Sequence, residues 1–289
     1  DGLVIDLRNN SGGSLDEVNE LVGLFITRGP TVQIRYTGSR VQALRDTDAG
    51  MLYNGPLAVM VNRLSASASE IFAGAMQDYE RAVVIGGQTF GKGTVQTLQP
   101  LNDGRLKYTQ AKFYRVSGGS TQNRGVEPDI NFPVIFDTEL IGESALPDAL
   151  PWDTIPPAEF SRQGRMRSLL PRLRERHLER VAESAEFNYL REQAGFLRDR
   201  RGEKFISLNE AERRAEREMN QQRRLRLENS LRRSRGLEEW ETYADLEADD
   251  DKDTDKDDKE LDAPTRETGE ILLDVIQISS SQLIGAVDK

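Results

Sequence analysis

The apolar positions of the first 136 residues alternate between short continuous runs and helical spacing. Leu3–Leu7 is a run of the kind that forms a buried strand, and Arg8–Gly13 after it is a strong turn signal. Ser14 then stands three residues before Glu17 in a capping-box pattern that predicts a helix start. The apolar face of that predicted helix comprises Leu15, Val18, Leu21, Val22 and Phe25.

The same alternation continues to about residue 114. Two further buried strands are predicted at Leu57–Val61 and Ala82–Ile85, and a helix is predicted between them at Ser69–Gln77. Thr94–Leu98 and Leu106–Tyr114 alternate like strands around Asn102-Asp103-Gly104, which predicts a β-hairpin. Strands that alternate with helices favour an α/β layer fold for residues 1–136.

The pattern changes after residue 136. Residues 137–160 are irregular and rich in proline, so we expect a linker. From Arg162 to about Tyr243 the chain consists mainly of Arg, Glu, Leu and Gln, which favours long helices with charge pairs. Glu270–Ile278 is an apolar patch that we expect to dock as a final helix. Residues 161–289 are therefore predicted to form a mainly α-helical C-terminal domain.

Composition excludes several classes of site. The 289 residues contain no cysteine, which rules out disulfides and thiolate metal sites. No apolar run reaches the roughly 18 residues of a membrane span, so we expect no transmembrane segment. The net charge is −10, but residues 245–262 hold eleven acidic residues against three lysines. We expect this acidic tract to be disordered and the rest of the chain to be near neutral.

A serine cluster is the first candidate for chemistry. Ser65, Ser67 and Ser69 follow a predicted strand and open a predicted helix. Free backbone N–H groups and the positive end of the helix dipole would stabilise an oxyanion there. The plain alternative is helix capping, for which serine is a favoured residue. Nothing local selects among the three serines.

Lys92 is the candidate base for such a serine. Cysteine is absent, and the single histidine, His177, lies in a charged helical stretch where we expect a surface residue. A lysine base must be neutral near pH 7, which requires its pKa to fall by about three units, or roughly 4 kcal/mol. Burial against Phe90 and Val95 would supply this. The plain alternative is an exposed lysine in a glycine turn.

Other motifs leave further alternatives open. Gly86–Lys92 resembles a phosphate-binding loop, but Gly93 replaces the required Ser or Thr and a strand-like segment follows. Arg162–Arg180 is basic, but interleaved glutamates and missing aromatics argue against nucleic acid. Asn10–Gly13 would donate a backbone N–H to an oxyanion or serve only as a turn. Glu70 and Asp78 would either orient the lysine or face water.

Together these segments resemble the carboxyl-terminal processing, tail-specific serine proteases of peptidase family S41, in the long periplasmic Prc-like branch. The resemblance is strong to about residue 160 and looser beyond. It implies a crotonase-like spiral of strand-strand-helix units, of which residues 1–136 would be the C-terminal part. The first half of the protease fold and the family's PDZ domain would precede Asp1, so we expect a fragment that is inactive by itself. The motifs are Ser65–Ile71, Thr89–Gln96, Phe113–Gln122, Gly125–Ile130 and Leu150–Asp153.

The resemblance also implies roles for individual residues. Ser67 would be the nucleophile and Lys92 the general base, with no metal or cofactor. Gln96 would position the lysine, Asp78 would support the site, and Ala68 and Gly13 would donate the oxyanion-hole N–H groups. The implied substrates are proteins with apolar, disordered C-termini in the periplasm, at or near the inner membrane, with a lipoprotein adaptor as a partner. An inactive scaffold of the same fold is the alternative.

Overall fold

A computed structural model of the chain describes residues 1–38, 40–201, 205–250 and 261–287. It divides into two compact units, which are described separately. The first unit contains residues 1–132, 136–175 and the chain from 267, and the second contains 133–135 and 176–266. The expected α/β fold followed by a helical C-terminal region is confirmed. Within the described residues, none of the helices combines the length and apolar content that crossing a bilayer requires.

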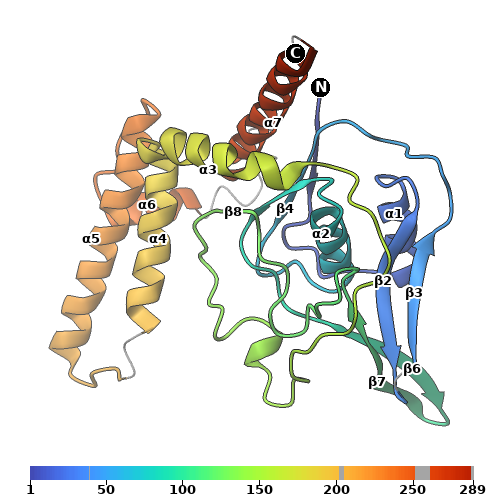
Figure 1. Cartoon of the computed structure of the whole chain (residues 1–289). Helices are drawn as coiled ribbons and strands as arrows, with labels where there is room; N and C mark the ends of the chain where they lie inside the picture. The colour runs from blue at the N-terminus through green and yellow to red at the C-terminus, as the bar shows by residue number, and fades with distance from the viewer. Residues whose placement is uncertain (39, 202–204, 251–260, 288–289) are drawn as a thin grey trace. The chain divides into compact units, whose positions relative to one another are not determined.

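The first unit contains a four-stranded parallel sheet, of which β4 and β8 are labelled in Figure 1. Every residue of its β4 and β5 is buried, as expected for apolar runs covered on both faces. Because the strands are parallel, the segments that leave β1, β4 and β5 emerge at one edge of the sheet. In the order β1-β4-β5-β8 the strands are Leu3–Asp6, Leu57–Val61, Val83–Gly86 and Ile130–Asn131.

A second, antiparallel sheet has the order β3-β2-β7-β6. Its β6–β7 hairpin turns at Asn102-Asp103, as predicted, with Leu101 paired to Gly104. The hairpin strands are longer than expected, and β2 and β3 were not predicted from the sequence. The strands are β2 Gly29–Tyr36, β3 Val41–Asp46, β6 Thr94–Leu101 and β7 Gly104–Tyr114.

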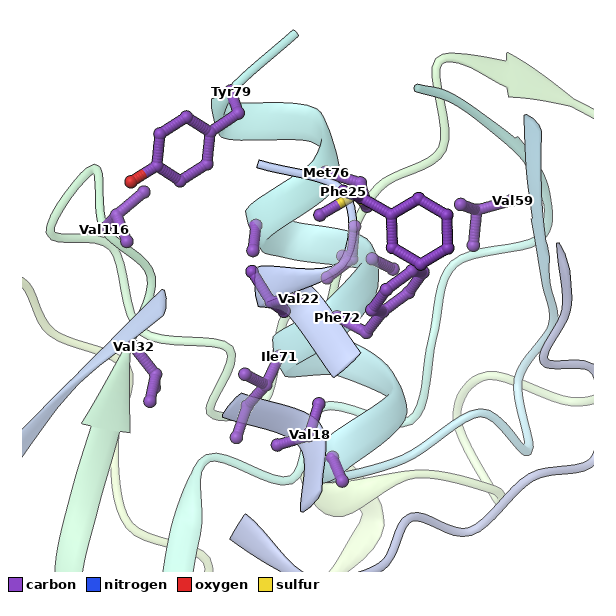
Figure 2. Packing of buried hydrophobic residues seen from close by; sticks show 14 of the residues in the cluster. Val18, Val22, Phe25, Val32, Val59, Ile71, Phe72, Met76, Tyr79 and Val116 are labelled. Carbon is purple, nitrogen blue, oxygen red and sulfur yellow. The ribbon is translucent and has the colours of Figure 1, made fainter. Parts of the chain in front are cut away.

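Helix α2 (Ala68–Asp78) runs through the core of the first unit, beside α1 (Leu15–Gly23). Figure 2 shows Phe72 of α2 among the buried side chains that include Phe25. The two rings meet edge to face with centroids 5.6 Å apart. Burial of such a side chain contributes roughly 1.5–3 kcal/mol. Residues 68–76 of α2 are all buried, so the helix is enclosed on nearly all sides. As predicted, the Ser14 hydroxyl caps α1 by accepting from the Glu17 N–H at 3.4 Å.

The proline-rich segment 137–160 is anchored to the first unit. The Asp153 carboxylate accepts from Lys112 Nζ at 2.5 Å and from Arg35 Nη2 at 2.5 Å. The Trp152 indole N–H donates to the Ser120 carbonyl at 2.9 Å. A short 3₁₀ helix, η1, covers Glu143–Ala145 in the same segment. These contacts hold the segment against the second sheet and the loops around it.

Helices dominate the rest of the chain. In the second unit, α4 and α5 run side by side (Figure 1). The acidic tract begins inside α6, and residues 251–260 lie outside the described part. The patch predicted to dock as a final helix does so in α7, where Ile271 is fully buried and Val275 is 4% exposed. The helices are α3 Met166–Ala182, α4 Ala185–Arg201, α5 Glu210–Ser234, α6 Tyr243–Asp250 and α7 Ala263–Val287.

The prediction that His177 is a surface residue is wrong. Its side chain is only 4% exposed, and its ring lies 5.9 Å from that of Phe187. Leu173 and Val181, four residues before and after it, are also buried. The histidine therefore belongs to the apolar stripe of α3, which the many charged residues of that segment obscure in the sequence.

Candidate active site

The three serines have different environments. Ser65 Oγ accepts from the Asn62 N–H at 2.9 Å and donates to the Leu7 carbonyl at 2.7 Å. Ser69 Oγ donates to Asn10, with its carbonyl and its Oδ1 each at 3.0 Å. Both hydroxyls thus tie the turn after β4 to the segment after β1. Ser67, by contrast, lines the same cavity as Lys92.

The backbone at Ser67 is strained. Its φ of 55° and ψ of −113° are rarely adopted by a residue with a side chain, and such strain is often found at functional sites. Gly12 packs directly against this turn, because a Cβ there would lie 2.7 Å from the Ala66 carbonyl oxygen. The Gly12 N–H is bonded to Asn10 Oδ1 at 2.9 Å. Gly13 has open space around it and lines the cavity.

The backbone of the Lys92 loop, residues 89–93, is completely hydrogen-bonded. Its glycines are required, since a Cβ at Gly91 or Gly93 would lie 2.8 Å or less from the backbone of residues 122–123. Every backbone polar group of the loop is thus satisfied, which stabilises the position of the Lys92 backbone. The partners of the five N–H groups in order are Val126 O, Ser65 O, Glu70 Oε1, Glu70 Oε2 and Gln122 Oε1, and those of the five carbonyls are Arg63, Glu143, Asn123, Thr121 and Phe113.

Glu70 joins the serine turn to the lysine loop. It is fully buried, and its Oε2 accepts from the Ser67 N–H at 2.8 Å and from the Lys92 N–H at 2.9 Å. Its Oε1 accepts from the Gly91 N–H at 2.7 Å and from Thr89 Oγ1 at 2.5 Å. Of the two expectations for Glu70, that it faces water is wrong, because the side chain is fully buried. Its contact with Lys92 is to the backbone N–H and not to the side chain.

Glu70 should make stability depend on pH. Burial raises the pKa of its carboxyl from 4.5 to about 7, although the hydrogen bonds from Thr89, Gly91, Ser67 and Lys92 act to lower it. Because the folded pKa exceeds the unfolded one, this contribution is complete below about pH 4.5 and is lost as the pH rises through about 7. At 1.36 kcal/mol per pH unit the loss is roughly 3 kcal/mol.

We therefore expect the intact protein that carries this chain to melt at a lower temperature at pH 8 than at pH 5. In Glu70→Gln the difference should shrink, because the titrating group is gone, while the exposed-residue control Glu127→Gln should behave like the wild type. Melting curves at both pH values measure the effect. An unchanged difference in Glu70→Gln would show that another group causes it.

Five of the six predicted site residues line one cavity of about 290 Å³. The cavity wall is otherwise apolar apart from Thr94 and Lys107, and it contains no acidic side chain. In the described part of the chain, no hydrogen bond joins Ser67 Oγ to Lys92 Nζ. The five predicted residues are Ser67, Lys92, Gln96, Ala68 and Gly13, and the apolar wall is Leu15, Ile71, Val95, Leu98 and Phe113.

Asp78 lies away from this cavity, at the opposite end of the 11-residue helix α2 from Ser67. Its carboxylate forms an ion pair with Arg115 and accepts from Ser117 Oγ at 2.9 Å. Asp78 therefore ties the end of α2 to the turn after β7. Asp78 contacts none of the cavity residues directly, so any effect on the site would be exerted through α2 or through β7, which carries the cavity residue Phe113.

The phosphate-loop alternative fails on local structure. The segment after Lys92 is the strand β6, beginning at Thr94, so the lysine loop does not open a helix as the phosphate-binding motif requires.

Four residues that hold the lysine loop were not predicted from the sequence: Arg63, Thr89, Gln122 and Glu143. Only the Ser67-x-x-Glu70 spacing, a capping-box pattern, could have indicated the role of Glu70.

Comparison with known proteins adds the family context. The profile of Peptidase family S41 matches residues 1–132, and that of the C-terminal domain of tail specific protease matches residues 136–277. A tail-specific protease of Haemophilus influenzae is 46% identical over 261 residues, covering 86% of this chain and 38% of the relative. A probable CtpA-like serine protease of Staphylococcus epidermidis is 40% identical over 132 residues, covering 45% of this chain and 27% of the relative.

Among solved structures, a photosystem II D1 C-terminal processing protease is 35% identical with a TM-score of 0.43, covering 48% of this chain and 36% of that one. The chain thus spans well under half the length of these relatives.

Proposed function

Because the chain belongs to peptidase family S41, we propose that it carries the catalytic dyad of a serine endopeptidase, with Ser67 as nucleophile and Lys92 as general base. The observation that carries the proposal is that both side chains line one cavity. Ser67 is the one of the three clustered serines that lines that cavity, and Lys92 stands on a loop whose backbone groups are all hydrogen-bonded.

The reaction is an acyl transfer in two halves. Neutral Lys92 accepts the Ser67 proton as Ser67 Oγ attacks the peptide carbonyl carbon. The carbonyl oxygen becomes an oxyanion that the Ala68 and Gly13 N–H groups stabilise. Lys92 then gives its proton to the leaving amine as the C–N bond breaks. Water, deprotonated by Lys92, attacks the acyl-serine, and the proton returns to Ser67 as the N-terminal part of the substrate leaves with a new carboxyl terminus.

The hydrogen bonds around the serine turn support Ala68 and Gly13 as the donors of the oxyanion hole. Ala68 is the first residue of α2, where helix N–H groups lack intrahelical partners and the dipole favours negative charge. The Gly12 N–H is already bonded to Asn10 Oδ1, which favours Gly13 as the second donor. Gln96 lies on β6 four residues after Lys92 with an exposed side chain, so its proposed effect on the lysine is exerted from the cavity rim.

The apolar part of the cavity wall favours apolar substrates. Leu15, Ile71, Val95, Leu98 and Phe113 supply that part, and the two lysines are the charged groups of the wall. A peptide bond must enter in an extended, unfolded segment to reach Ser67. The substrates we propose are therefore proteins with apolar, disordered C-termini. The bacterial periplasm as setting and a lipoprotein adaptor as partner follow from the branch of the family that the motifs resemble.

A pair of reporter proteins tests this function. The two reporters differ only in a disordered C-terminal tail, which is apolar in one and rich in Asp, Lys and Ser in the other. We expect the intact protein to cleave the apolar reporter at least about 10-fold faster, since each desolvated apolar side chain adds about 1–3 kcal/mol of discrimination. Ser67→Ala should cleave neither. Equal rates would contradict the substrate class, and no cleavage without serine labelling would favour the inactive scaffold.

A further inference from the structure

The 3₁₀ turn η1 reaches both sides of Lys92. The Glu143 N–H donates to the Phe90 carbonyl at 3.0 Å. The Glu143 Oε1 accepts from Gln122 Nε2 at 3.1 Å, and Gln122 Oε1 in turn accepts from the Gly93 N–H at 2.9 Å. One residue thus holds the loop two positions before Lys92 and, through one amide, one position after it.

Arg63 fastens the same segment to the loop. Its side chain is 1% exposed, and Nη1 donates to the Thr89 carbonyl at 2.6 Å. Nε donates to the Ile141 carbonyl at 2.6 Å and Nη2 to the Thr138 carbonyl at 3.0 Å. The fit requires Gly142, because a Cβ there would lie 2.1 Å from Arg63 Nη2. A buried guanidinium bound to neutral carbonyls is costly, so this junction is specific rather than incidental.

The loop needs such support for a physical reason. Two glycines flank Lys92, and glycine backbones are intrinsically free. The lysine side chain is long and flexible, so its amine reaches Ser67 reliably only if the backbone is fixed. A misplacement of about 1 Å can cost about 10²-fold in rate.

We propose that Glu143 is a positioning residue for Lys92, acting through Gln122 and Phe90 to fix the loop that directs the lysine amine toward Ser67. The inference rests on the proposed function. Residues 138–144 lie beyond the match to Peptidase family S41 and within the match to the C-terminal domain. Residues at the start of the C-terminal domain therefore help to position the catalytic base.

An exchange of the two side chains is the sharpest test. In Gln122→Glu two buried carboxylates face each other, so we expect kcat to fall about 10- to 50-fold with KM within twofold of wild type. In Glu143→Ala the Gln122 amide is left unpaired, and we expect kcat to fall about 10-fold. Combining Gln122→Glu with Glu143→Gln places a carboxylate oxygen beside the Gly93 N–H and restores an amide–carboxylate hydrogen bond between positions 122 and 143, with the donor and acceptor exchanged. This double variant should recover to within about threefold of wild type.

Two further measurements separate positioning from stability. Labelling of Ser67 by a serine-reactive phosphonate should slow in parallel with kcat, while the melting temperature of each variant should not predict its rate. Glu139→Gln, an exposed carboxylate on the same segment, is the matched control and should leave both rates unchanged. If the wild type neither cleaves nor labels, the proposed function fails. If it does both and Gln122→Glu and Glu143→Ala keep wild-type kcat, or the double variant does not recover, the positioning role is overturned.

Discussion

Replacing Ser67 with alanine is expected to lower proteolysis by the intact protein by a factor of about 10³ or more and to abolish labelling by a serine-reactive phosphonate. The reason is chemical, because alanine keeps the Cβ and removes only the attacking oxygen. The fold should persist, since the Ser67 N–H that binds Glu70 and the carbonyl that accepts from the Glu70 N–H belong to the backbone. The melting temperature should therefore stay close to that of the wild type.

Ser65→Ala and Ser69→Ala are the matched controls. Their hydroxyls bond Asn62, Leu7 and Asn10, so each substitution should cost about 1–3 kcal/mol of stability. Labelling at Ser67 should nevertheless continue at a rate within about 10-fold of wild type. Labelling that survives in Ser67→Ala and disappears in Ser65→Ala or Ser69→Ala would move the nucleophile to another serine of the cluster.

The sequence predicted the elements whose apolar pattern was strongest. Leu57–Val61 is one uninterrupted apolar run, and the structure confirms it as β4 residue for residue. Strands β2 and β3 were missed although Thr31–Tyr36 alternates polar and apolar residues as a strand does, because Gly29 and Pro30 at the start of β2 indicate a turn. The pairing of β2 with β7 and with β3 joins distant segments, and the local pattern does not encode it.

The sequence also indicated which residues carry the chemistry, but it did not indicate the hydrogen bonds that support those residues. Serine and lysine in small-residue motifs indicate a dyad by their type. Arg63 and Glu143 act through side-chain contacts to Thr89, Ile141 and Gln122, which lie between 21 and 78 positions away. No spacing rule reports such contacts. Glu70 was noticed as a nearby carboxylate, yet its four hydrogen bonds depend on two turns meeting in space.

The backbone of Lys92 holds the loop in place, whereas its side chain takes no part in those contacts. The backbone of residues 89–93 is bonded to Glu70, Gln122, Arg63 and neighbouring main-chain groups, and none of these bonds uses the lysine side chain. A change of that side chain should therefore leave the loop in place. Lys92 is for this reason a position at which loss of activity can be separated from loss of structure.

Lys92→Ala is accordingly expected to lower proteolysis by about 10³-fold or more with little change in melting temperature, because the proton acceptor is removed. Lys92→Arg should be equally inactive. Arginine keeps a cation of similar reach, but it stays protonated at any working pH and cannot accept the Ser67 proton. Steady-state cleavage of the apolar-tailed reporter and the rate of phosphonate labelling measure both variants.

Lys107 provides the matched control, since it lines the same cavity and also carries an amine. Lys107→Ala and Lys107→Arg should keep kcat within about threefold of wild type. If Lys92→Arg were active, the cavity would need only a positive charge at this position, and the assignment of Lys92 as the base would be wrong. If Lys107→Ala instead lost activity as completely as Lys92→Ala, the proton acceptor would have to be sought on the β6–β7 hairpin, because that is where Lys107 lies.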